Sequence, residues 1–540
     1  MSGCIHTITN FIKSVMILWP KFPDALVHRI FFVMQAYLTN GWRLSFTHAG
    51  AIMNFWEGMS LILPIFLQFM ADTFLGNLVV ASVSTLFSFT GIGMVALSVP
   101  RILDNHGGRC PSLEAESCVN HTQVALFFTG MVLIAIGRAG ISFSLDALHD
   151  EQNADSNCCK TCFTTCLNCA VRTDKYCIHL VGSLLIFICI RKWKLLFGIP
   201  AVYSAYMGIS FLCGTCCYIR SKPKGSPIAT ACRVIYAAAT SNNKSQQRPD
   251  GRKPSFAIGR FPRCLNRVLA TEGESADNVR RFEQQRVETA GFIVRMVPIS
   301  MTFLVCGMVS SIGNTYFVEQ ANHMNRKVGS WNVPLLALQL PVIFFKFFHD
   351  MWLSLFFKCS KNKLSFAITG IASAMFYSVV CCITAAGMEM KRLKVIRKYG
   401  LLDKPDDEVI PMHAAWLLLQ FFLLAGLDSF LRTSILEFYK GCAPEHLQIR
   451  LRDENGNDGR ALGRYLDVAV DFVSGLGFLW SVLSVYIVGK LSNWFKYTLN
   501  RSRLDRYYWL LAGLSAVNLL VFTVVASVYK RKENTNRNRG

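Results

Sequence analysis

The feature that most constrains this chain is a series of apolar runs, each about 20 residues long, separated by polar segments. A helix of about 20 residues crosses the ~30 Å hydrocarbon core of a bilayer. The strands of a membrane β-barrel are shorter and alternate between apolar and polar residues, a pattern that these runs lack. With 52% hydrophobic and 17% charged residues in 540, the chain is predicted to be an all-α polytopic membrane protein.

The runs predict about 12 transmembrane helices. A first span would end within 28–39, although Pro20, Pro23 and Asp24 just upstream are unfavourable in a helix that faces lipid. The remaining spans are predicted at 46–70, 75–99, 123–146, 170–190, 196–219, 292–317, 333–358, 364–387, 410–434, 466–490 and 507–529.

Basic residues are concentrated in the long polar segment in the middle of the chain, and the net charge is +22. Lysine and arginine next to spans mark the cytoplasmic side of a membrane protein. Nucleic-acid binding would need a folded reader domain, which we do not find, so no nucleic-acid partner is expected. The predicted domains are an N-terminal transmembrane bundle, a basic cytoplasmic linker, and a C-terminal bundle with a short basic tail: 1–219, 220–290 and 291–540. Two bundles joined in this way are typical of alternating-access transporters.

This topology places both termini in the cytoplasm and the loop 101–122 outside. Cys110 and Cys118 in that loop could form a disulfide in an oxidising compartment. Asn120 begins a possible glycosylation sequon in the same loop, and Asn500 begins another in a later outer loop. The segment 388–405 disagrees, because it would be external and yet carries six basic residues. The larger basic linker decides the orientation that we predict.

Several motifs resemble those of the plant nitrate/peptide transporters, a branch of the proton-coupled oligopeptide transporters in the major facilitator superfamily. The most specific is YFVEQANHMNRKVGSWNVP at 316–334, which is similar to the family's pattern FFVxQGxxMDRxxGxFxIP after the seventh span. The resemblance covers about residues 37–530. Further similar motifs in register are ADTFLG at 71–76, FGIPAV at 197–202, KPKGSP at 222–227, VRMVPIS at 294–300, LEFYKGCAP at 436–444 and DRYYWLLAGLSAVNLLVF at 505–522.

The resemblance implies a major facilitator fold, with two six-helix bundles around a cavity near mid-membrane. It also implies a secondary active transporter that moves nitrate, a short peptide or a plant metabolite by alternating access, driven by protons. The partners would be a small-molecule or ion substrate, protons and the lipid bilayer, in the plasma membrane or the vacuolar membrane. A non-transporting sensor or interaction protein, or an uncoupled facilitator, is the alternative.

The family's proton-handling residues are largely absent from this chain. The ExxER motif of the family's first span falls on Pro20, Pro23 and Asp24. In the fourth span, Ser142 takes the place of the family's cavity lysine, and Arg138 lies one helical turn earlier. Proton coupling therefore cannot be carried over from the resemblance residue by residue.

Charged residues inside spans are costly and usually face a cavity or a partner, which makes them candidates for the site. Asp428 and Arg432 lie four residues apart on one face of the tenth span, where they can line a cavity or pair with each other. Asp471 is a candidate proton site, unless a cation such as Arg432 keeps it ionised. Arg138 is a candidate for binding an anion. We predict a substrate or proton site from Asp428, Arg432, Asp471 and Arg138.

Two further polar groups flank the predicted centre. Lys346, His349 and Asp350 share one face of the eighth span, and we interpret them as a gate or cluster at its inner end. The joint at 316–334 is expected near the outer gate, where its polar side chains contact water and neighbouring loops; a simple capped turn is the alternative. Its candidate residues are Glu319, Gln320 and Arg326.

The run 157–169 contains five cysteines with CxxC spacing. A zinc knuckle, apolar packing and palmitoylation are the possible interpretations, and we predict no metal site because no histidine or second ligand pair is nearby. No cofactor is expected. No phosphate-binding glycine loop or nucleophile–base pair was found, so the protein is not expected to be an enzyme.

Overall fold

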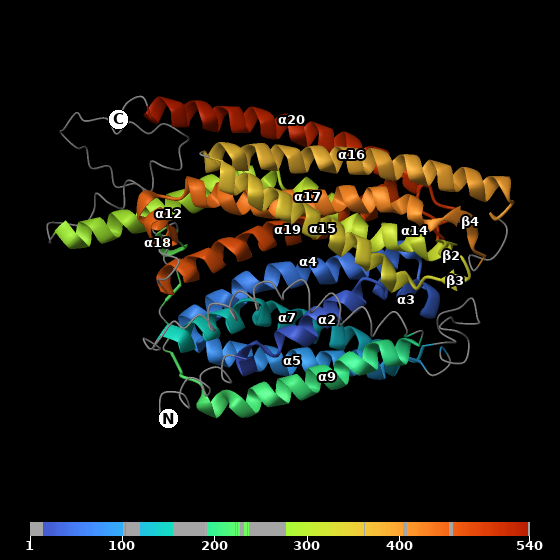
Figure 1. The fold of residues 1–540 in the computed structure, drawn as a ribbon, viewed down its shortest axis with the longest axis horizontal. Coiled ribbons are helices and arrows are strands. Elements are labelled where there is room, and N and C mark those ends of the chain that lie inside the picture. Colours follow the sequence, from blue (N-terminus) through green and yellow to red (C-terminus); the bar gives the residue numbers. More distant parts are fainter. Residues whose placement is uncertain are drawn as a thin grey trace.

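The computed structural model describes residues 15–100, 103, 119–154, 190, 192–221, 223, 225–226, 232–234, 236, 277–360, 362–402, 408–452 and 457–537. Its long helices run side by side along the longest axis of the molecule (Figure 1). Helices from the first half of the chain form one group and helices from the second half form another (Figure 1). We call these groups the N-terminal bundle and the C-terminal bundle.

The N-terminal bundle is built around α7, which packs against both α4 and α5. A π-helical turn, η1 (Ala71–Leu75), extends α4, and a 3-10 turn, η3 (Thr215–Cys217), follows α9. The helices of this bundle are α2 (Lys21–Phe31), α3 (Met34–Gly41), α4 (Phe46–Met70), α5 (Asn77–Leu97), α7 (His121–Ala154) and α9 (Trp193–Gly214).

In the C-terminal bundle, α16 packs against α17 and α20, and α17 packs against α15. Its helices are α12 (Asp277–Met301), α13 (Leu304–Ile312), α14 (Val318–His323), α15 (Gln339–Cys359), α16 (Lys363–Lys398), α17 (Leu418–Cys442), α18 (Glu445–Arg452), α19 (Asn457–Leu491) and α20 (Leu504–Arg537). Shorter elements are the π-helical η4 (Gly313–Phe317), the 3-10 turns η5 (Leu335–Leu338) and η6 (Ala414–Leu417), and the strands β1 (Met324–Asn325), β2 (Lys327–Val328), β3 (Trp331–Asn332) and β4 (Ile410–His413).

Within the described ranges, nine helices are long and apolar enough to cross a membrane. A tenth is added if α12 and the helical stretch Leu304–His323, which runs from α13 to α14, form one span bent by 49°. Pro298 lies in α12 just before this bend, where its missing N–H removes a helical hydrogen bond. The predicted span at 170–190 lies outside the described residues.

The first span is helical despite its prolines. α2 begins at Lys21 directly after Pro20, and Pro23 lies in its first turn, where backbone N–H groups have no helical partner to lose. A short break separates α2 from α3, so neither piece spans a membrane by itself. Tyr37 of α3 is fully buried among aromatic rings of the N-terminal bundle, including Trp193 at a centroid distance of 5.0 Å.

The two bundles meet most extensively where α4 crosses α19. Two glycines permit this approach, because a Cβ added to Gly475 would lie 2.7 Å from the carbonyl oxygen of Gly58. Helices with small residues at their crossing approach closely and gain van der Waals contact in a membrane. This crossing fixes the spacing between the bundles.

We name the two ends of the molecule from the predicted topology, in which the basic linker and the C-terminal tail are cytoplasmic. The start of α12 and the end of α20 lie at one end, and strands β2, β3 and β4 lie at the other (Figure 1). We call these the inner end and the outer end. α12 starts at Asp277, so helical structure begins before residue 290, where the predicted linker ends.

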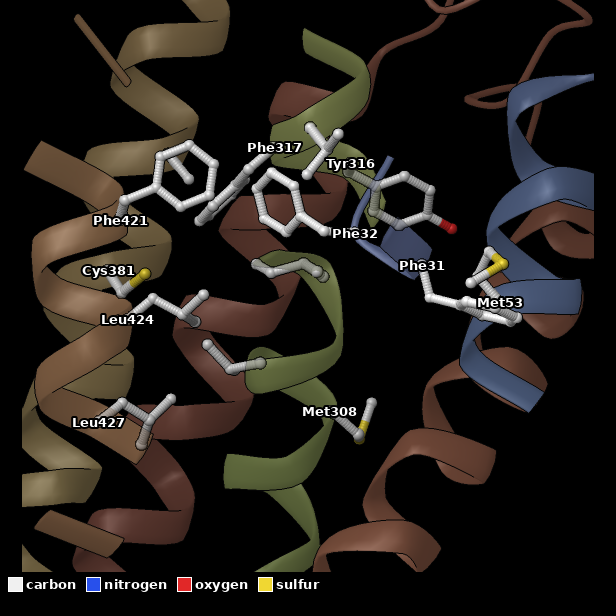
Figure 2. Close-up of a cluster of buried hydrophobic side chains, with 14 of the residues drawn as sticks. Phe31, Phe32, Met53, Met308, Tyr316, Phe317, Cys381, Phe421, Leu424 and Leu427 are labelled. Atoms are coloured by element: carbon white, nitrogen blue, oxygen red, sulfur yellow. The ribbon is translucent and has the colours of Figure 1, made fainter. Parts of the chain in front are cut away.

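Aromatic side chains from the first span pack against the C-terminal bundle. Phe32 lies beside Phe317 and Phe421 in the buried cluster of Figure 2, with a ring centroid distance of 6.4 Å to Phe421. Phe317 and Phe421 make an edge-to-face contact at 5.7 Å. The buried apolar core is therefore continuous across both bundles.

Candidate functional site

A cavity of about 80 Å³ lies between the two bundles, and both of them line it. Side chains from α2 and α4 form one wall, and side chains from η4, α15 and α19 form the opposite wall. Its lining residues are His28, Arg29, Phe31, Phe32, Met53, Asn54, Trp56, Glu57, Asn314, Thr315, Gln339, Val342 and Phe478.

The wall from the N-terminal bundle is a rigid aromatic surface. The rings of Phe31 and Trp56 stack at a centroid distance of 4.2 Å. The indole Nε1 of Trp56 donates a hydrogen bond to the backbone carbonyl of Met131 at 2.9 Å, which fixes the ring on α7. Arg138 lies over the Trp56 ring, with its guanidinium carbon 5.8 Å from the ring centre. An apolar group of a solute would pack against this surface.

Charged and polar side chains of both bundles complete the lining. His28 and Arg29 come from α2 and Glu57 from α4, so the cavity contains side chains of both charge types. The amide of Gln339 on α15 is 3% exposed, and its Nε2 donates to the backbone carbonyl of Arg29 at 2.5 Å. The Asn314 side chain is exposed on the opposite wall. The cavity therefore offers a carboxylate, a guanidinium, an imidazole and amides within one partly open space.

Arg138 lies one layer behind the cavity. Its Nη1 is 2.5 Å from Nδ1 of His28, which does line the cavity. The predicted anion-binding residue is therefore close to the site, although its own side chain is not part of the lining.

The predicted pair of Asp428 and Arg432 is not formed. Asp428 accepts a hydrogen bond from the Ser310 hydroxyl at 2.5 Å, and Lys346 is the nearby cation with the largest electrostatic effect on it. Arg432 instead forms an ion pair with Asp471 of α19. Both residues therefore contact partners on other helices, Asp428 on α13 and Arg432 on α19, rather than each other.

Asp471 forms this ion pair with Arg432. A neighbouring cation was the condition under which Asp471 would not act as a proton site. Asp467 lies 3.8 Å from the same guanidinium, and the Arg432 side chain is 48% exposed. Neither Asp428, Arg432 nor Asp471 lines the described cavity.

Lys346, His349 and Asp350 lie together in the middle of α15 rather than at its inner end. Asp350 acts electrostatically on His349, and Lys346 and Asp350 both act on Asp428. His349 is 2% exposed, and its Nδ1 lies 2.7 Å from the Phe345 carbonyl among the rings of neighbouring aromatic residues. Lys346 acts electrostatically on both His28 and Asp428, which places it near the centre of the molecule.

The first part of the polar joint at the outer end, 316–322, is buried, whereas residues 327–332 are exposed. Glu319 is 1% exposed and accepts hydrogen bonds from Thr39 at 3.2 Å and from His323 at 3.0 Å. Arg326 donates to the Ala321 carbonyl at 3.4 Å. Because Thr39 belongs to α3, the joint connects the two bundles.

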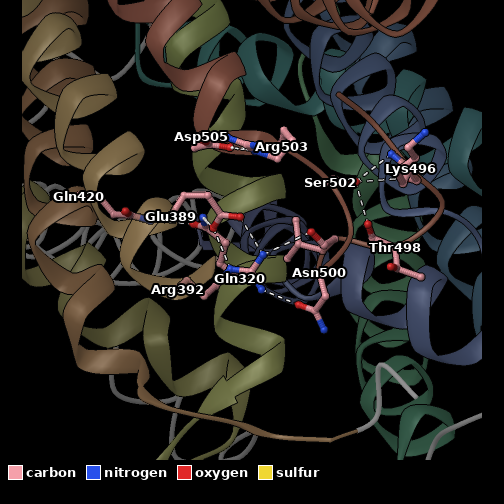
Figure 3. A network of polar contacts seen from close by, with 11 residues as sticks. Gln320, Glu389, Arg392, Gln420, Lys496, Thr498, Asn500, Ser502, Arg503 and Asp505 are labelled. Carbon is pink, nitrogen blue, oxygen red and sulfur yellow. Dashed lines mark hydrogen bonds and ion pairs between the residues drawn. The ribbon is translucent and has the colours of Figure 1, made fainter. Parts of the chain in front are cut away.

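Gln320 joins this region to a network that sequence reasoning missed (Figure 3). Its Nε2 donates to Glu389 at 2.6 Å, and Glu389 forms a buried ion pair with Arg392 at 2.7 Å. Arg392 also donates to Oδ1 of Asn500 at 2.6 Å. Asn500 is 5% exposed and its side chain belongs to this network, while glycosylation at this residue stays a prediction.

This network accounts for one of the six basic residues in 388–405, the segment whose charge disagreed with its predicted external position. Arg392, one of its six basic residues, is neutralised inside the protein. Nearby, hydrogen bonds with Asp505 at 3.1 Å raise the pKa of the Arg503 guanidinium. Asn120, the other predicted glycosylation site, is exposed at the start of α7.

The inner end is also bridged between the bundles. Asp150 of α7 accepts from Arg460 at 3.0 Å and from Arg464 at 2.6 Å, both on α19. The Tyr465 hydroxyl donates to Asp72 of η1 at 2.5 Å. The central cavity is thus flanked by bundle-to-bundle contacts at both ends.

Several lining residues were not predicted from the sequence. Each was visible as a polar or charged residue in an apolar run, but no sequence rule identified the helix face that meets the other bundle. These residues are His28, Arg29, Asn54, Glu57, Asn314 and Gln339. Cys110, Cys118 and the cysteine run 157–169 lie outside the described residues.

Known proteins with similar sequences decide the family. The POT family profile (PTR2) matches residues 171–451. Protein NRT1/PTR FAMILY 5.5 of Arabidopsis thaliana is 31% identical over 526 residues, which are 92% of this chain and 93% of that protein. The chain belongs to the NRT1/PTR family. Protein NRT1/PTR FAMILY 4.5 of the same plant is 27% identical and covers 92% of this chain and 88% of its own.

Solved structures of POT family transporters share the fold. The crystal structure of an auto-inhibited POT family peptide transporter has a TM-score of 0.67 at 16% identity, covering 95% of this chain and 96% of that chain. The structure of the transporter PepTSo gives 0.65 at 15% identity, with coverage of 96% and 98%. The predicted major facilitator fold is confirmed, and this NRT1/PTR member is an integral membrane protein and a secondary transporter.

Proposed function

We propose that this NRT1/PTR transporter moves a small zwitterionic organic solute, such as a short peptide or an amino-acid conjugate, together with protons. The observation that carries this proposal is the cavity between the bundles, which contains Glu57 together with Arg29 and His28. A carboxylate binds an ammonium group, and a guanidinium binds a carboxylate in bidentate geometry. Phe31 and Trp56 supply the apolar surface that an organic side chain requires.

Nitrate is the second candidate substrate. Arg29, Arg138 and Lys346 all act electrostatically on His28, so the cations in and around the lining outnumber its single carboxylate, Glu57. A small anion needs such positive charge but gains little from the aromatic wall. The stacked rings therefore favour the organic solute.

Uptake by purified protein in proteoliposomes tests the proposal. Labelled dipeptide, amino-acid conjugate and nitrate are compared at acidic and neutral external pH. We expect accumulation of a zwitterion that increases when the outside is acidic. Accumulation of nitrate alone would favour the second candidate, and uptake that is unaffected by pH would contradict proton coupling.

The Glu57→Gln variant tests the cavity in the same assay. Uptake of the zwitterion should fall about tenfold or more, because a hydrogen bond to a charged group contributes about 1.5–3 kcal/mol. Glu437→Gln is the matched control, since Glu437 pairs with Lys440 on a partly exposed face of α17, away from the cavity. Equal uptake by both variants would exclude Glu57 from the binding site.

A further inference from the structure

Asp24 and His28 form an unusual pair beside the cavity. They lie four residues apart on α2, so their side chains share one face of that helix. Arg138 from α7 is hydrogen-bonded to His28 at 2.5 Å and also has the largest electrostatic effect of any charge on Asp24. One guanidinium therefore acts on both residues, as a hydrogen-bond donor to His28 and as a nearby positive charge for Asp24.

The bond between Arg138 and His28 determines the protonation state of the imidazole. A guanidinium has five N–H donors and no acceptor. Nδ1 of His28 must therefore accept, which leaves this nitrogen without a proton and the ring neutral. A proton that binds Nδ1 removes the acceptor and places two cations in contact, so the hydrogen bond breaks.

Asp24 provides the acceptor that Arg138 then needs. Among the described residues, Oδ1 of Asp24 is buried and has no hydrogen-bond partner. A buried polar atom is normally paired, and an unpaired one costs about 1–3 kcal/mol. Lys21, another nearby cation, is held in an ion pair with Asp146.

From these contacts we infer that Arg138 is a mobile guanidinium that leaves His28 for Asp24 when His28 takes up a proton from the cavity. This inference rests on the proposed proton symport. One proton adds to the Nδ1 lone pair, the hydrogen bond from Arg138 to His28 breaks, and an ion pair between Arg138 and Asp24 forms. No other bond changes, and the site gains one positive charge.

The remaining charged groups around His28 connect this exchange to the solute. Arg29 lies next to it on α2, Lys346 faces it from α15, and Glu57 of α4 lines the same cavity. Arg138 also lies over the Trp56 ring, which forms the cavity wall. Movement of the guanidinium therefore changes the charge beside the cavity and the contact between Arg138 and the Trp56 ring.

The family's first-span carboxylates are replaced by Pro20 and Pro23 in this chain, so the proposed exchange assigns the proton to a different group. His28 binds the proton in this scheme. Asp24 and Arg138 are positioning residues that act through it.

The test uses the full-length protein in proteoliposomes and compares two measurements for each variant. The first is uptake driven by an inward proton gradient, and the second is counterflow exchange at equal pH on both sides. His28 lines the cavity, so its substitution also changes solute binding. The ratio of the two measurements cancels that change. Variants are His28→Gln, whose amide oxygen accepts from Arg138 but does not titrate, and Asp24→Asn, which removes the second acceptor's charge.

Both variants should lose the stimulation by the proton gradient while counterflow exchange remains measurable. His48→Gln is the control, since His48 is exposed at the start of α4 and should retain the wild-type ratio. If either variant keeps wild-type stimulation, the exchange mechanism is wrong although symport stands. If the wild-type protein itself shows no stimulation, proton symport fails and the mechanism fails with it. Should His28→Gln not fold, Asp24→Asn gives the same decision independently.

Discussion

The charged groups of the outer network are all paired, whereas buried polar atoms beside the central cavity lack partners. In the outer network, Glu389, Arg392 and Gln320 are joined by hydrogen bonds of 2.6–2.8 Å and are almost completely buried. Beside the cavity, Oδ1 of Asp24 and Oε1 of Gln339 are buried and lack partners among the described residues. An unpaired polar atom destabilises a protein more in a low-dielectric interior than at its surface.

This difference separates a structural region from a working one. A network whose charged groups are all paired specifies one arrangement of the helices that contribute to it. Unpaired groups remain available to a solute, a proton or a rearranged side chain. The outer network should therefore govern stability, and the central groups should govern transport.

Arg392→Ala is expected to have the largest effect. Removing one member of a buried ion pair leaves an uncompensated charge and typically costs about 3–5 kcal/mol. Thermal unfolding of the purified protein should show a marked loss of Tm. Lys391→Ala is the control, because Lys391 is exposed and contacts the Trp416 ring. Replacing Glu389 and Arg392 together by methionine should recover stability, and an unchanged Tm for Arg392→Ala would contradict the structural role.

Gly475→Ala should have the next largest effect. The new Cβ would lie 2.7 Å from the Gly58 carbonyl oxygen, so α4 and α19 must move apart. Overpacking of this kind costs about 1–3 kcal/mol. We expect reduced transport together with a lower Tm. Gly513→Ala on α20 is the control, since no described atom lies within 4 Å of its added Cβ.

Lys346→Gln and Asp428→Asn should show coupled effects on transport. Lys346 is the cation that acts most strongly on Asp428, so removal of either partner alters the other. A double-mutant cycle of uptake rates should give a coupling of about 0.5–3 kcal/mol, the range for residues in one charged network. Additive effects would mean that the two charges act independently, which would weaken the contrast with the outer network.

Asp471→Asn should have the smallest effect. Its partner Arg432 is 48% exposed, and solvent-exposed ion pairs contribute about 0–1 kcal/mol. Tm should therefore change little, and uptake should keep its dependence on pH. A loss of pH dependence in this variant would restore Asp471 as the proton site. Asp467→Asn is the matched control on the same helix.

Much of the fold was predictable because hydrophobic length is a local property. The apolar runs and the motifs at 71–76 and 316–334 indicated two bundles and the correct family. The first span was judged unfavourable because of Pro20 and Pro23, yet both residues fall where a helix begins. The span is helical in two pieces, α2 and α3, and neither is among the described helices long enough to cross a membrane.

The site was less predictable because its geometry depends on neighbouring helices. The spacing of Asp428 and Arg432 satisfied a local pairing rule, but each found a partner on another helix, Ser310 and Asp471 respectively. The sequence identified costly residues in the membrane. It did not identify which of them, such as Glu57, face the space between the bundles.

The most direct test of the central claim is an experimental structure, by electron cryo-microscopy, of the protein with a transported solute bound. Density for the solute should lie between α2 and α4 on one side and η4, α15 and α19 on the other, in contact with Glu57 and the Trp56 ring. Density beside Arg432 and Asp471, with the cavity between the bundles empty, would contradict the claim.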